Sequence, residues 1–313
     1  MNPADFFRFA RERHCIYLRR QDGAPRDQWT SDPVLREYRF TNVYRELDAT
    51  TVWFRENVRD RLRHTPEVLL ATVLFRWLNR TTAGEAIFQQ RLLGDETAWD
   101  VLMRRGPGGL EDVAQAVRSY CGKGPYVTGS YIIKTPDGMD KLQGVLWCVQ
   151  QFMISSRQFQ SGGDNHHSGD FGWQSVSRVC MHGGVLIPLE QVWEWLCQFP
   201  FLGGFMAYEI VTDLRHTALL DRAPDIMTWA NAGPGARRGL NRILGRPLGH
   251  NQHEYLWTVE MRELLDLSQV RGYWPNSADF PPLEMRDIEH TLCEFDKYER
   301  TRLSEGRPRQ RYR

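Results

Sequence analysis

The sequence of 313 residues lacks any apolar run of about 18 residues, the length that a membrane-spanning helix requires. Its first residues place Asp5, Arg8 and Arg11 among the apolar ones, so they do not form the hydrophobic core of a signal peptide. We therefore expect a soluble protein that is not secreted and has no membrane partner.

Closely spaced cysteines are also missing. The 6 cysteines are scattered along the chain, with no CxxC pair and no group of four. Structural zinc sites and iron–sulfur clusters need thiolates at such short spacings. His166, His167, Cys180 and His182 lie close together in the sequence but match no zinc spacing. The sequence therefore predicts no metal site, and we interpret the cysteines as reduced, mostly buried thiols.

Lysine is scarce as well. Lys and Arg together number 40 against 39 Asp and Glu, and the basic residues are overwhelmingly arginine. Arginine suits planar, two-point contacts with phosphates and carboxylates better than lysine does. A net charge of +1 does not exclude nucleic acid, because phosphate binding needs only a local basic face. Arginine clusters at residues 8–13, 19–20 and 237–242 could form one; solvated helix faces are the alternative.

Apolar spacing predicts an all-α fold. The expected helices span about residues 4–18, 32–48, 66–80, 97–104, 110–120, 138–156, 188–198, 204–214, 254–266 and 283–303. Asp32-Pro33 and Thr65-Pro66 are typical of helix starts, because Asp and Thr cap a helix and proline fits its first turn. Only residues 126–133 resemble a strand.

No internal repeat and no linker rich in Pro, Gly and Ser divides the chain. We expect a single two-lobed catalytic unit over residues 1–303, followed by a basic tail at residues 304–313. A Gly- and His-rich stretch at residues 161–170 and the tail from Arg307 onward are expected to be mobile without a ligand.

Two of the expected helices flank a short turn within residues 188–214. The sequence there reads LCQFPFLGGFMA over residues 196–207. Glycine lets the turn backbone approach a phosphate, and the amides that begin the second helix can donate to it. We interpret the segment as a helix-hairpin-helix that binds DNA through Pro200, Leu202, Gly203 and Gly204. An ordinary corner between two helices, without a ligand, is the alternative.

The residues after this hairpin resemble those of helix-hairpin-helix DNA glycosylases. In those enzymes an aspartate follows at a similar distance and opens a helix that faces the flipped base, and Asp225 resembles it in position. Bifunctional members carry a nucleophilic lysine where this sequence has Phe205, so we do not expect lyase chemistry. Capping of a helix after Pro224 is the alternative role for Asp225.

A second resemblance covers nearly the whole chain. It is carried by the strings FFRF at residues 6–9, RER at 11–13, YRFTNVYRELD at 38–48, FRWLNR at 75–80, MAYEIVTDLR at 206–215, LEMRDIEH at 283–290 and CEFDKYE at 293–299. These strings look like one bacteriophage family. It comprises the α-glutamyl/putrescinyl-thymine pyrophosphorylases, also described as amino acid:DNA transferases and labelled as a hydroxymethyluracil DNA kinase helical domain.

This resemblance implies a role in thymine hypermodification. 5-Hydroxymethyluracil in double-stranded phage DNA is phosphorylated, and an amino acid such as glycine, or a polyamine, displaces the phosphate or pyrophosphate. The chain would catalyse that displacement in the cytoplasm of the infected host cell, with Mg²⁺ able to accompany the leaving group. A separate kinase would supply the phosphate, because the sequence has no GxxxxGK[ST] loop.

The same resemblance implies roles for particular residues. Asp225 would orient or deprotonate the amine, or stabilise positive charge as the phosphate ester leaves. Trp229 and Asn231 would stack on the flipped base and read its edge. The phosphate and the carboxylate of an amino acid call for arginine donors. The candidates for substrate and phosphate contacts are Arg39, Asn42, Arg45, Asp48, Arg76, Asn79, Arg237, Glu284 and Arg286.

Spacing supports part of this set. Arg39, Asn42 and Arg45 stand at i, i+3 and i+6, which places them on one face of the expected helix, and Asp48 continues that face. A surface network of ion pairs is the alternative. Glu284 and Arg286 begin a helix in which Ile288, Leu292 and Phe295 are expected to form the buried stripe.

Two other functions fit the same features. A monofunctional DNA glycosylase would use Asp225 to activate water and would need no amine pocket. A non-catalytic DNA-binding subunit would position the modification machinery.

Overall fold

The computed structural model describes residues 3–91, 94–130, 132–155, 186–270, 272–308 and 310–312. These residues form helices, turns and two isolated β-bridges, and no sheet occurs among them. The prediction of an all-α fold is confirmed. The expected strand is wrong, because the described residues of 126–133 lie in a loop. The Gly- and His-rich stretch lies outside the described residues.

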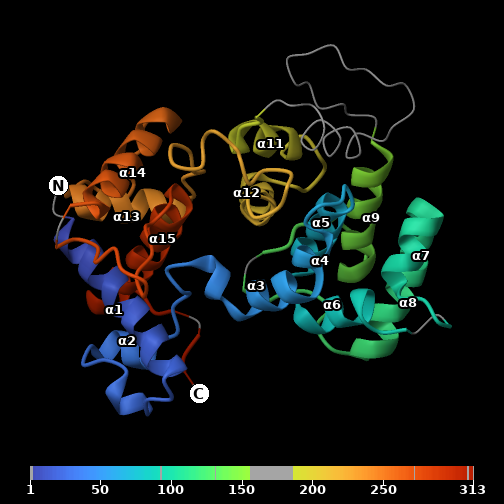
Figure 1. Cartoon of the computed structure of the whole chain (residues 1–313), viewed down its shortest axis with the longest axis horizontal. Coiled ribbons are helices and arrows are strands. Elements are labelled where there is room, and N and C mark those ends of the chain that lie inside the picture. The colour runs from blue at the N-terminus through green and yellow to red at the C-terminus, as the bar shows by residue number, and fades with distance from the viewer. Residues whose placement is uncertain are drawn as a thin grey trace. The chain divides into compact units, whose positions relative to one another are not determined.

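The chain forms two compact units (Figure 1). Unit 1 consists of Met1–Asp48 and Ile226–Arg313, and unit 2 consists of Ala49–Asp225. That the units act as one catalytic body over residues 1–303 stays a prediction.

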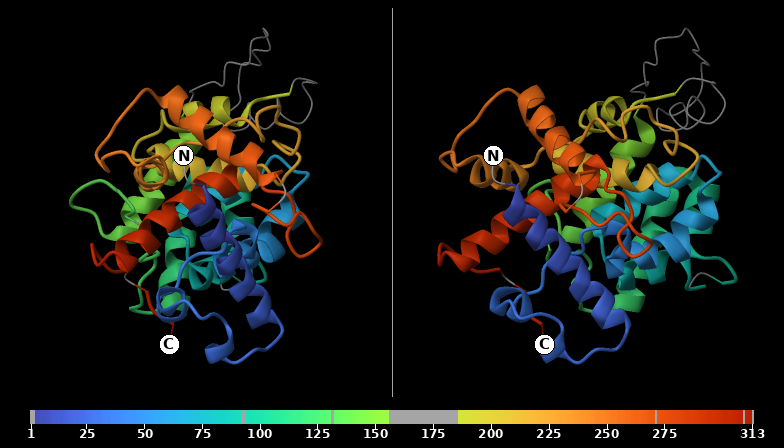
Figure 2. Two further views of the ribbon diagram at one scale, coloured as in Figure 1. Left: turned by 90° about the vertical axis from the view of Figure 1, so that its left-hand side faces the viewer. Right: turned by 60° about the vertical axis from the view of Figure 1, so that its left-hand side comes forward.

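Unit 1 is built on a long C-terminal helix. Its helices are α1 (Ala4–Gln21), α2 (Pro33–Glu37), α13 (Pro234–Leu244), α14 (Glu254–Ser268) and α15 (Met285–Arg302), with 3-10 turns η1 (Arg26–Gln28) and η2 (Arg45–Leu47). Figure 2 shows α15 beside α1 and α13, which both contact it. Aromatic side chains form much of this core: the rings of Phe6 and Phe295 lie 5.8 Å apart, and those of Phe9 and Tyr298 5.0 Å apart.

The close approach of α13 to α15 depends on glycine. A Cβ at Gly239 would overlap the backbone carbonyl oxygen of Leu292, and a Cβ at Gly235 would overlap Sγ of Cys293. The two backbones can therefore pack closely only where α13 has no side chain. The packing places Leu292 and Cys293 of α15 directly against α13.

Unit 2 surrounds an apolar helix. Its elements are α3 (Ala49–Phe54), the π-helical turn η3 (Arg55–Arg59), α4 (Asp60–Leu62), α5 (Val68–Leu78), α6 (Thr81–Phe88), α7 (Ala98–Arg105), η4 (Gly106–Gly109), α8 (Leu110–Cys121), α9 (Lys141–Ile154), α11 (Leu189–Leu196) and α12 (Gly204–Leu214). Every residue of α5 is buried, as a helix that is apolar all round requires. It contacts α9 and α12, which lie on either side of it in Figure 1.

The expected helix at residues 32–48 is wrong. α2 ends at Glu37, and Tyr38 is extended, with φ −101° and ψ 141°. The reason is a long-range pairing that spacing cannot reveal: Tyr38 forms an antiparallel bridge with Arg311, and the Arg39 amide donates to the carbonyl of Gln310 at 3.0 Å. Arg39, Asn42 and Arg45 therefore do not share a helical face.

The C-terminal tail is docked rather than free. The amide of Tyr312 donates to the carbonyl of Glu37 at 3.1 Å, and its ring lies 5.1 Å from that of Trp29. The guanidinium of Arg20 stacks over both rings. The described residues from Arg307 onward, 307–308 and 310–312, therefore contact unit 1, and their expected mobility stays a prediction.

Candidate functional site

A stripe of polar side chains runs along one face of α15. Its members are spaced three or four residues apart, or directly adjacent, which places them on one side of a helix. They are Arg286, Glu289, His290, Cys293, Glu294 and Lys297. We call this set the polar stripe. Ile288, Leu292 and Phe295 are buried on the apolar side, as the sequence predicted.

The segment at residues 41–48 contacts the polar stripe. Oγ1 of Thr41 lies 2.6 Å from Nε2 of His290, and the Thr41 amide donates to Oε2 of Glu294 at 3.3 Å. Glu294 also pairs with Nζ of Lys297. One threonine therefore connects this segment to two members of the stripe.

Asn42, Arg45 and Asp48 are brought together by this segment, although not by a helix. The buried Asn42 side chain accepts from Nη2 of Arg13 at 2.7 Å and donates to Oδ1 of Asp48 at 3.0 Å. Arg45 pairs with Oδ2 of Asp48 at 2.9 Å. Arg39 stands apart, exposed beside the docked tail.

Burial and neighbouring charges set the protonation of two groups in the stripe. Burial alone would lower the pKa of Lys297, but the Glu294 carboxylate outweighs burial. The pKa is therefore raised, and Lys297 stays protonated. Burial raises the pKa of the Cys293 thiol to about 12. Neither group is therefore a nucleophile near neutral pH, because an amine or thiol attacks only when deprotonated.

The start of α15 carries two predicted site residues. Glu284 caps the helix in a reciprocal arrangement with Asp287, whose side chain accepts from the Glu284 amide at 2.9 Å. Arg286 lies 3.7 Å from Glu289. Arg286 belongs to the polar stripe, whereas Glu284 has a capping role.

Three further predicted residues lie on or before α13. Trp229 is buried and Asn231 is half-buried. Arg237 donates to both carboxylate oxygens of Glu254 at 2.6 Å and to the carbonyl of Ala232 at 2.7 Å. These contacts tie Arg237 to the start of α14.

Arg76 and Asn79 lie together in unit 2. The buried Arg76 guanidinium pairs with the buried carboxylate of Asp213, and its Nη1 donates to the Asn79 carboxamide at 3.0 Å. Nη1 of Arg59 lies 3.5 Å from the same carboxylate. The network around Arg76 is therefore buried rather than a surface network of ion pairs, and removing one partner would leave a costly unpaired charge.

Asp225 does not open a helix, which corrects the prediction. It lies in a turn, and the next helix along the chain, α13, begins nine residues later at Pro234. Its two carboxylate oxygens accept from the backbone amides of Leu189 at 2.7 Å and Glu190 at 3.0 Å. Asp225 therefore caps α11, a helix that precedes it in the sequence, and its catalytic role stays a prediction.

Two helices joined by a short turn are present in unit 2, and that they form a DNA-binding helix-hairpin-helix stays a prediction. α11 and α12 are joined by residues 197–203, and Gly203 stands at the N-cap of α12 with φ −77° and ψ 173°. A Cβ at Gly203 would meet nothing within 4 Å. Pro200 is half-buried and Leu202 is buried, so Leu202 could approach a phosphate only through its backbone. Phe205 is 51% exposed and does not fill a core position.

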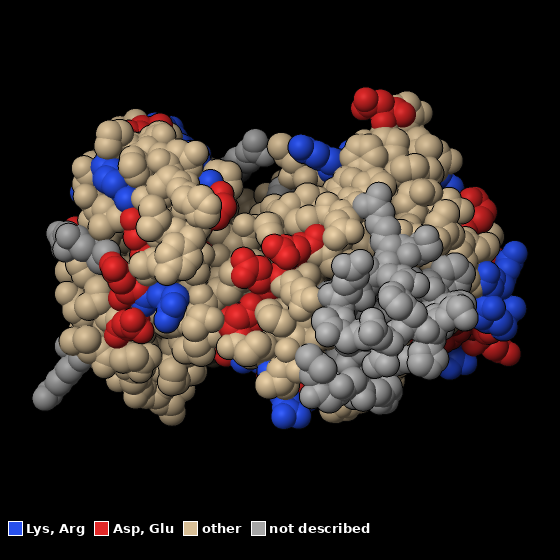
Figure 3. All heavy atoms as spheres, turned by 90° about the horizontal axis from the view of Figure 1, so that it is seen from above, with Lys and Arg blue, Asp and Glu red and all other residues tan. Residues whose placement is uncertain are grey.

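Charge over the surface is mixed. On the face shown in Figure 3, neither unit presents a continuous basic area among the residues drawn in colour. Within the described ranges, no cluster of three His, Cys, Asp or Glu could hold a metal ion. Nor do those ranges contain a helix long and apolar enough to cross a membrane.

Sequence reasoning did not single out Thr41, Arg13, His290 or Glu294 as site residues. The last two could have been found from the polar spacing opposite the apolar side of the helix at 283–303. Arg13 and Thr41 could not, because only the fold brings them to Asn42 and α15.

The chain belongs to the family described as 5-hmdU DNA kinase, helical domain, whose model matches residues 3–307. It is 26% identical over 312 residues to a protein of Bacillus phage SP10 named 5-hmdU DNA kinase. That match covers 92% of this chain but 43% of the relative, so the chain spans less than half of the relative's length. No solved structure matches the chain.

Proposed function

We propose that this chain is an enzyme of thymine hypermodification that joins an amine to phosphorylated 5-hydroxymethyluracil in double-stranded phage DNA. Membership of the 5-hmdU DNA kinase helical-domain family over residues 3–307 carries the proposal. The named relative comes from a phage, which supports a phage-encoded protein that works in the infected host cell. An amino acid such as glycine, or a polyamine, would supply the amine.

Transfer of the amine, rather than phosphorylation, is favoured by what the sequence lacks. It contains no GxxxxGK[ST] loop to hold the phosphates of a nucleotide. More than half of the relative's length lies outside its match to this chain. In our proposal phosphorylation belongs to a separate kinase, and this chain uses the phosphorylated base.

The reaction requires one bond to form and one to break. The amine nitrogen attacks the methylene carbon at C5 of the base, the carbon–oxygen bond breaks, and phosphate or pyrophosphate leaves with the electron pair. The amine loses a proton to a carboxylate. The N-glycosidic bond stays intact, which separates this reaction from base excision.

The polar stripe and the segment at 41–48 offer groups of both signs for such a substrate. Arg45 and Lys297 would meet the leaving phosphate, and Lys297 is suited to this because its ammonium is held. Asp48, whose side chain is 16% exposed, would bind the ammonium of the incoming amine. The side chains of Lys297 and Arg45 are 39% and 19% exposed, which lets a ligand reach them.

The test is direct. The full chain is incubated with glycine and with DNA that carries phosphorylated 5-hydroxymethyluracil. The DNA is then digested to nucleosides, whose masses are measured by mass spectrometry. A thymidine whose mass corresponds to phosphate replaced by glycine supports transfer. A released free base supports the monofunctional glycosylase, and binding without any product supports a DNA-binding subunit.

The DNA-binding subunit is a second candidate with an observation of its own. The family is described as a helical domain, and the relative named as a kinase is more than twice as long as the matched region. Under this alternative the chain would present modified DNA to a kinase. It would then raise the kinase's rate on DNA while making no product itself.

A further inference from the structure

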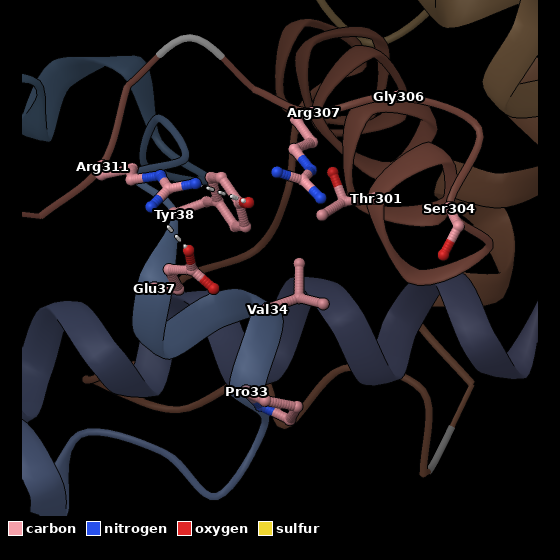
Figure 4. Close-up of a pocket in the computed structure, with 9 residues that line it drawn as sticks. All are labelled: Pro33, Val34, Glu37, Tyr38, Thr301, Ser304, Gly306, Arg307 and Arg311. Atoms are coloured by element: carbon pink, nitrogen blue, oxygen red, sulfur yellow. Dashed lines mark hydrogen bonds and ion pairs between the residues drawn. The ribbon is translucent and has the colours of Figure 1, made fainter.

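Unit 1 holds a cavity of about 380 Å³ between α2 and the end of α15 (Figure 4). Pro33, Val34 and Tyr38 line one side, and Thr301 and the residues that follow α15 line the other. Its volume falls in the range of about 300–1,000 Å³ that is usual for small-ligand sites. It is separate from the polar stripe, which faces residues 41–48.

The cavity carries an excess of positive charge. Arg307 and Arg311 line it together with a single carboxylate, that of Glu37. Nη1 of Arg311 lies 3.1 Å from Glu37, and its guanidinium stacks 5.2 Å from the centre of the Tyr38 ring. Arg311 therefore neutralises Glu37, and the charge of Arg307 remains.

Arg307 has no hydrogen bond or ion pair with any residue in the described parts of the chain. Its side chain is exposed, and in Figure 4 its guanidinium points toward the middle of the cavity. The nearby carboxylate of Asp32 is committed to capping α2 and to the Tyr298 hydroxyl, and Glu305 pairs with Arg242. No acidic partner is therefore left for Arg307 among these residues.

The hydroxyl of Ser304 is a second donor in the cavity for an anion. Ser304 follows α15 in a left-handed conformation with φ 61°, and its hydroxyl can donate to a ligand. Thr301 is less available, because its hydroxyl donates to the Lys297 carbonyl at 2.9 Å. A planar guanidinium with five donors matches the oxygens of a phosphate better than those of any neutral ligand.

The surface beside the cavity adds to the positive charge. Arg36 and Arg39 are exposed on either side of Glu37 and Tyr38 in the sequence. Arg20 and Arg26 stack on Tyr312, whose amide is bonded to Glu37. These arginines lie on segments next to the lining residues, and their charge attracts phosphates before they bind.

We propose that the cavity lined by Arg307, Arg311 and Ser304 is a binding site for a phosphate group, supplied by the DNA backbone or by free phosphate or pyrophosphate. The DNA source rests on the proposed function, whereas the phosphate chemistry does not. A phosphate would be held by the guanidinium groups of Arg307 and Arg311, with Glu37 keeping Arg311 in place.

The test uses the full chain and its Arg307→Ala variant, with Arg262→Ala as the matched control. Arg262 is an exposed arginine on α14 of the same unit, so its loss removes the same charge. Binding of an unmodified, fluorescently labelled DNA duplex is measured at several salt concentrations. In a second arm, binding of inorganic phosphate and of pyrophosphate is measured by calorimetry.

If the DNA backbone supplies the phosphate, Arg307→Ala weakens DNA binding by about three- to tenfold and lowers the salt slope by about one, because one phosphate contact is lost. If free phosphate is the ligand, the variant loses phosphate or pyrophosphate binding and keeps its DNA affinity. Arg262→Ala changes neither the DNA affinity nor the phosphate binding. The proposal is overturned if Arg307→Ala and Arg262→Ala behave alike in both arms. A wild-type chain that binds phosphate but no DNA would count against the proposed function and leave this site standing.

Discussion

Oγ1 of Thr41 lies 2.6 Å from Nε2 of His290, and 249 positions of the sequence separate the two residues. This contact and the bond from the Thr41 amide to Glu294 join the segment at 41–48 to the polar stripe of α15. The groups of both signs that an amine and a phosphate ester require are therefore assembled within unit 1 by tertiary contacts.

Asn42 is expected to position this segment. Asn42→Ala should lower the free energy of unfolding by about 2–3 kcal/mol, because the buried bonds to Arg13 and Asp48 are lost and the Arg13 guanidinium is left with fewer acceptors. Urea denaturation measures the change. Asn251→Ala is the control. Asn251 is exposed, and its single bond to Arg237 is long, at 3.5 Å, so its loss should lower the free energy of unfolding by about 0.5 kcal/mol or less. Equal losses in the two variants would show that the bonds of Asn42 do not hold the segment.

Asp225 has a structural role and a predicted catalytic one, and two substitutions separate them. Asp225→Ala should cost about 1–2 kcal/mol of stability, because the amides of Leu189 and Glu190 lose their cap. Asp225→Asn keeps one acceptor oxygen and should cost less. The catalytic prediction requires the Asn variant to lose amine transfer while it keeps its fold and its DNA affinity. If the Asn variant still transferred the amine, Asp225 would have only its structural role as the cap of α11.

Substitution by alanine should affect the stability of the protein differently at two glycines. Gly239→Ala should destabilise the protein by about 1–3 kcal/mol, because its Cβ would overlap the Leu292 carbonyl and push α13 from α15. Gly203→Ala meets open space and should cost about 1 kcal/mol or less, yet it should weaken DNA binding if the hairpin contacts phosphate. Thermal unfolding and a DNA-binding titration check both. Unchanged DNA affinity in Gly203→Ala would favour an ordinary corner between two helices.

Much of the fold could be predicted from apolar spacing. The helices around residues 68–78, 110–121 and 285–302 have regular apolar patterns, and the structure has helices there. α13 was missed, because Gly233, Pro234 and Gly235 at its start are typical of a loop. In the structure Pro234 fits the first turn and the glycines allow close packing on α15, which local sequence cannot reveal.

The site could be predicted only in part. Asn42, Arg45 and Asp48 were identified correctly as neighbours, but for a wrong reason, since a pairing between Tyr38 and Arg311 interrupts the expected helix. Arg39 was grouped with them on that expected face and lies elsewhere. The link to α15 is invisible in the sequence, because it depends on contacts between residues far apart along the chain.

Stability should fall at high pH through Cys293. Its pKa is raised from 9.0 to about 12, so the native state holds the thiol proton more tightly than the unfolded state does. This contribution is fully present below about pH 9 and is lost as the pH rises toward 12, at up to about 1.4 kcal/mol per pH unit. Cys293→Ala should flatten the dependence of unfolding free energy on pH between 9 and 11. Cys15→Ala, at a half-buried thiol, should change it less, and an unchanged slope in Cys293→Ala would contradict the assignment.

The central claim is amine transfer to phosphorylated 5-hydroxymethyluracil, and a mass measurement on nucleosides tests it most directly. The chain is incubated with ¹⁵N-glycine and DNA carrying the phosphorylated base, and with the same DNA lacking the phosphate as the control. The account predicts a thymidine that carries one ¹⁵N-glycine, formed only from the phosphorylated DNA, together with released phosphate or pyrophosphate. Phosphorylated nucleosides recovered unchanged with folded, DNA-bound protein, or a free base in place of the labelled nucleoside, would contradict it.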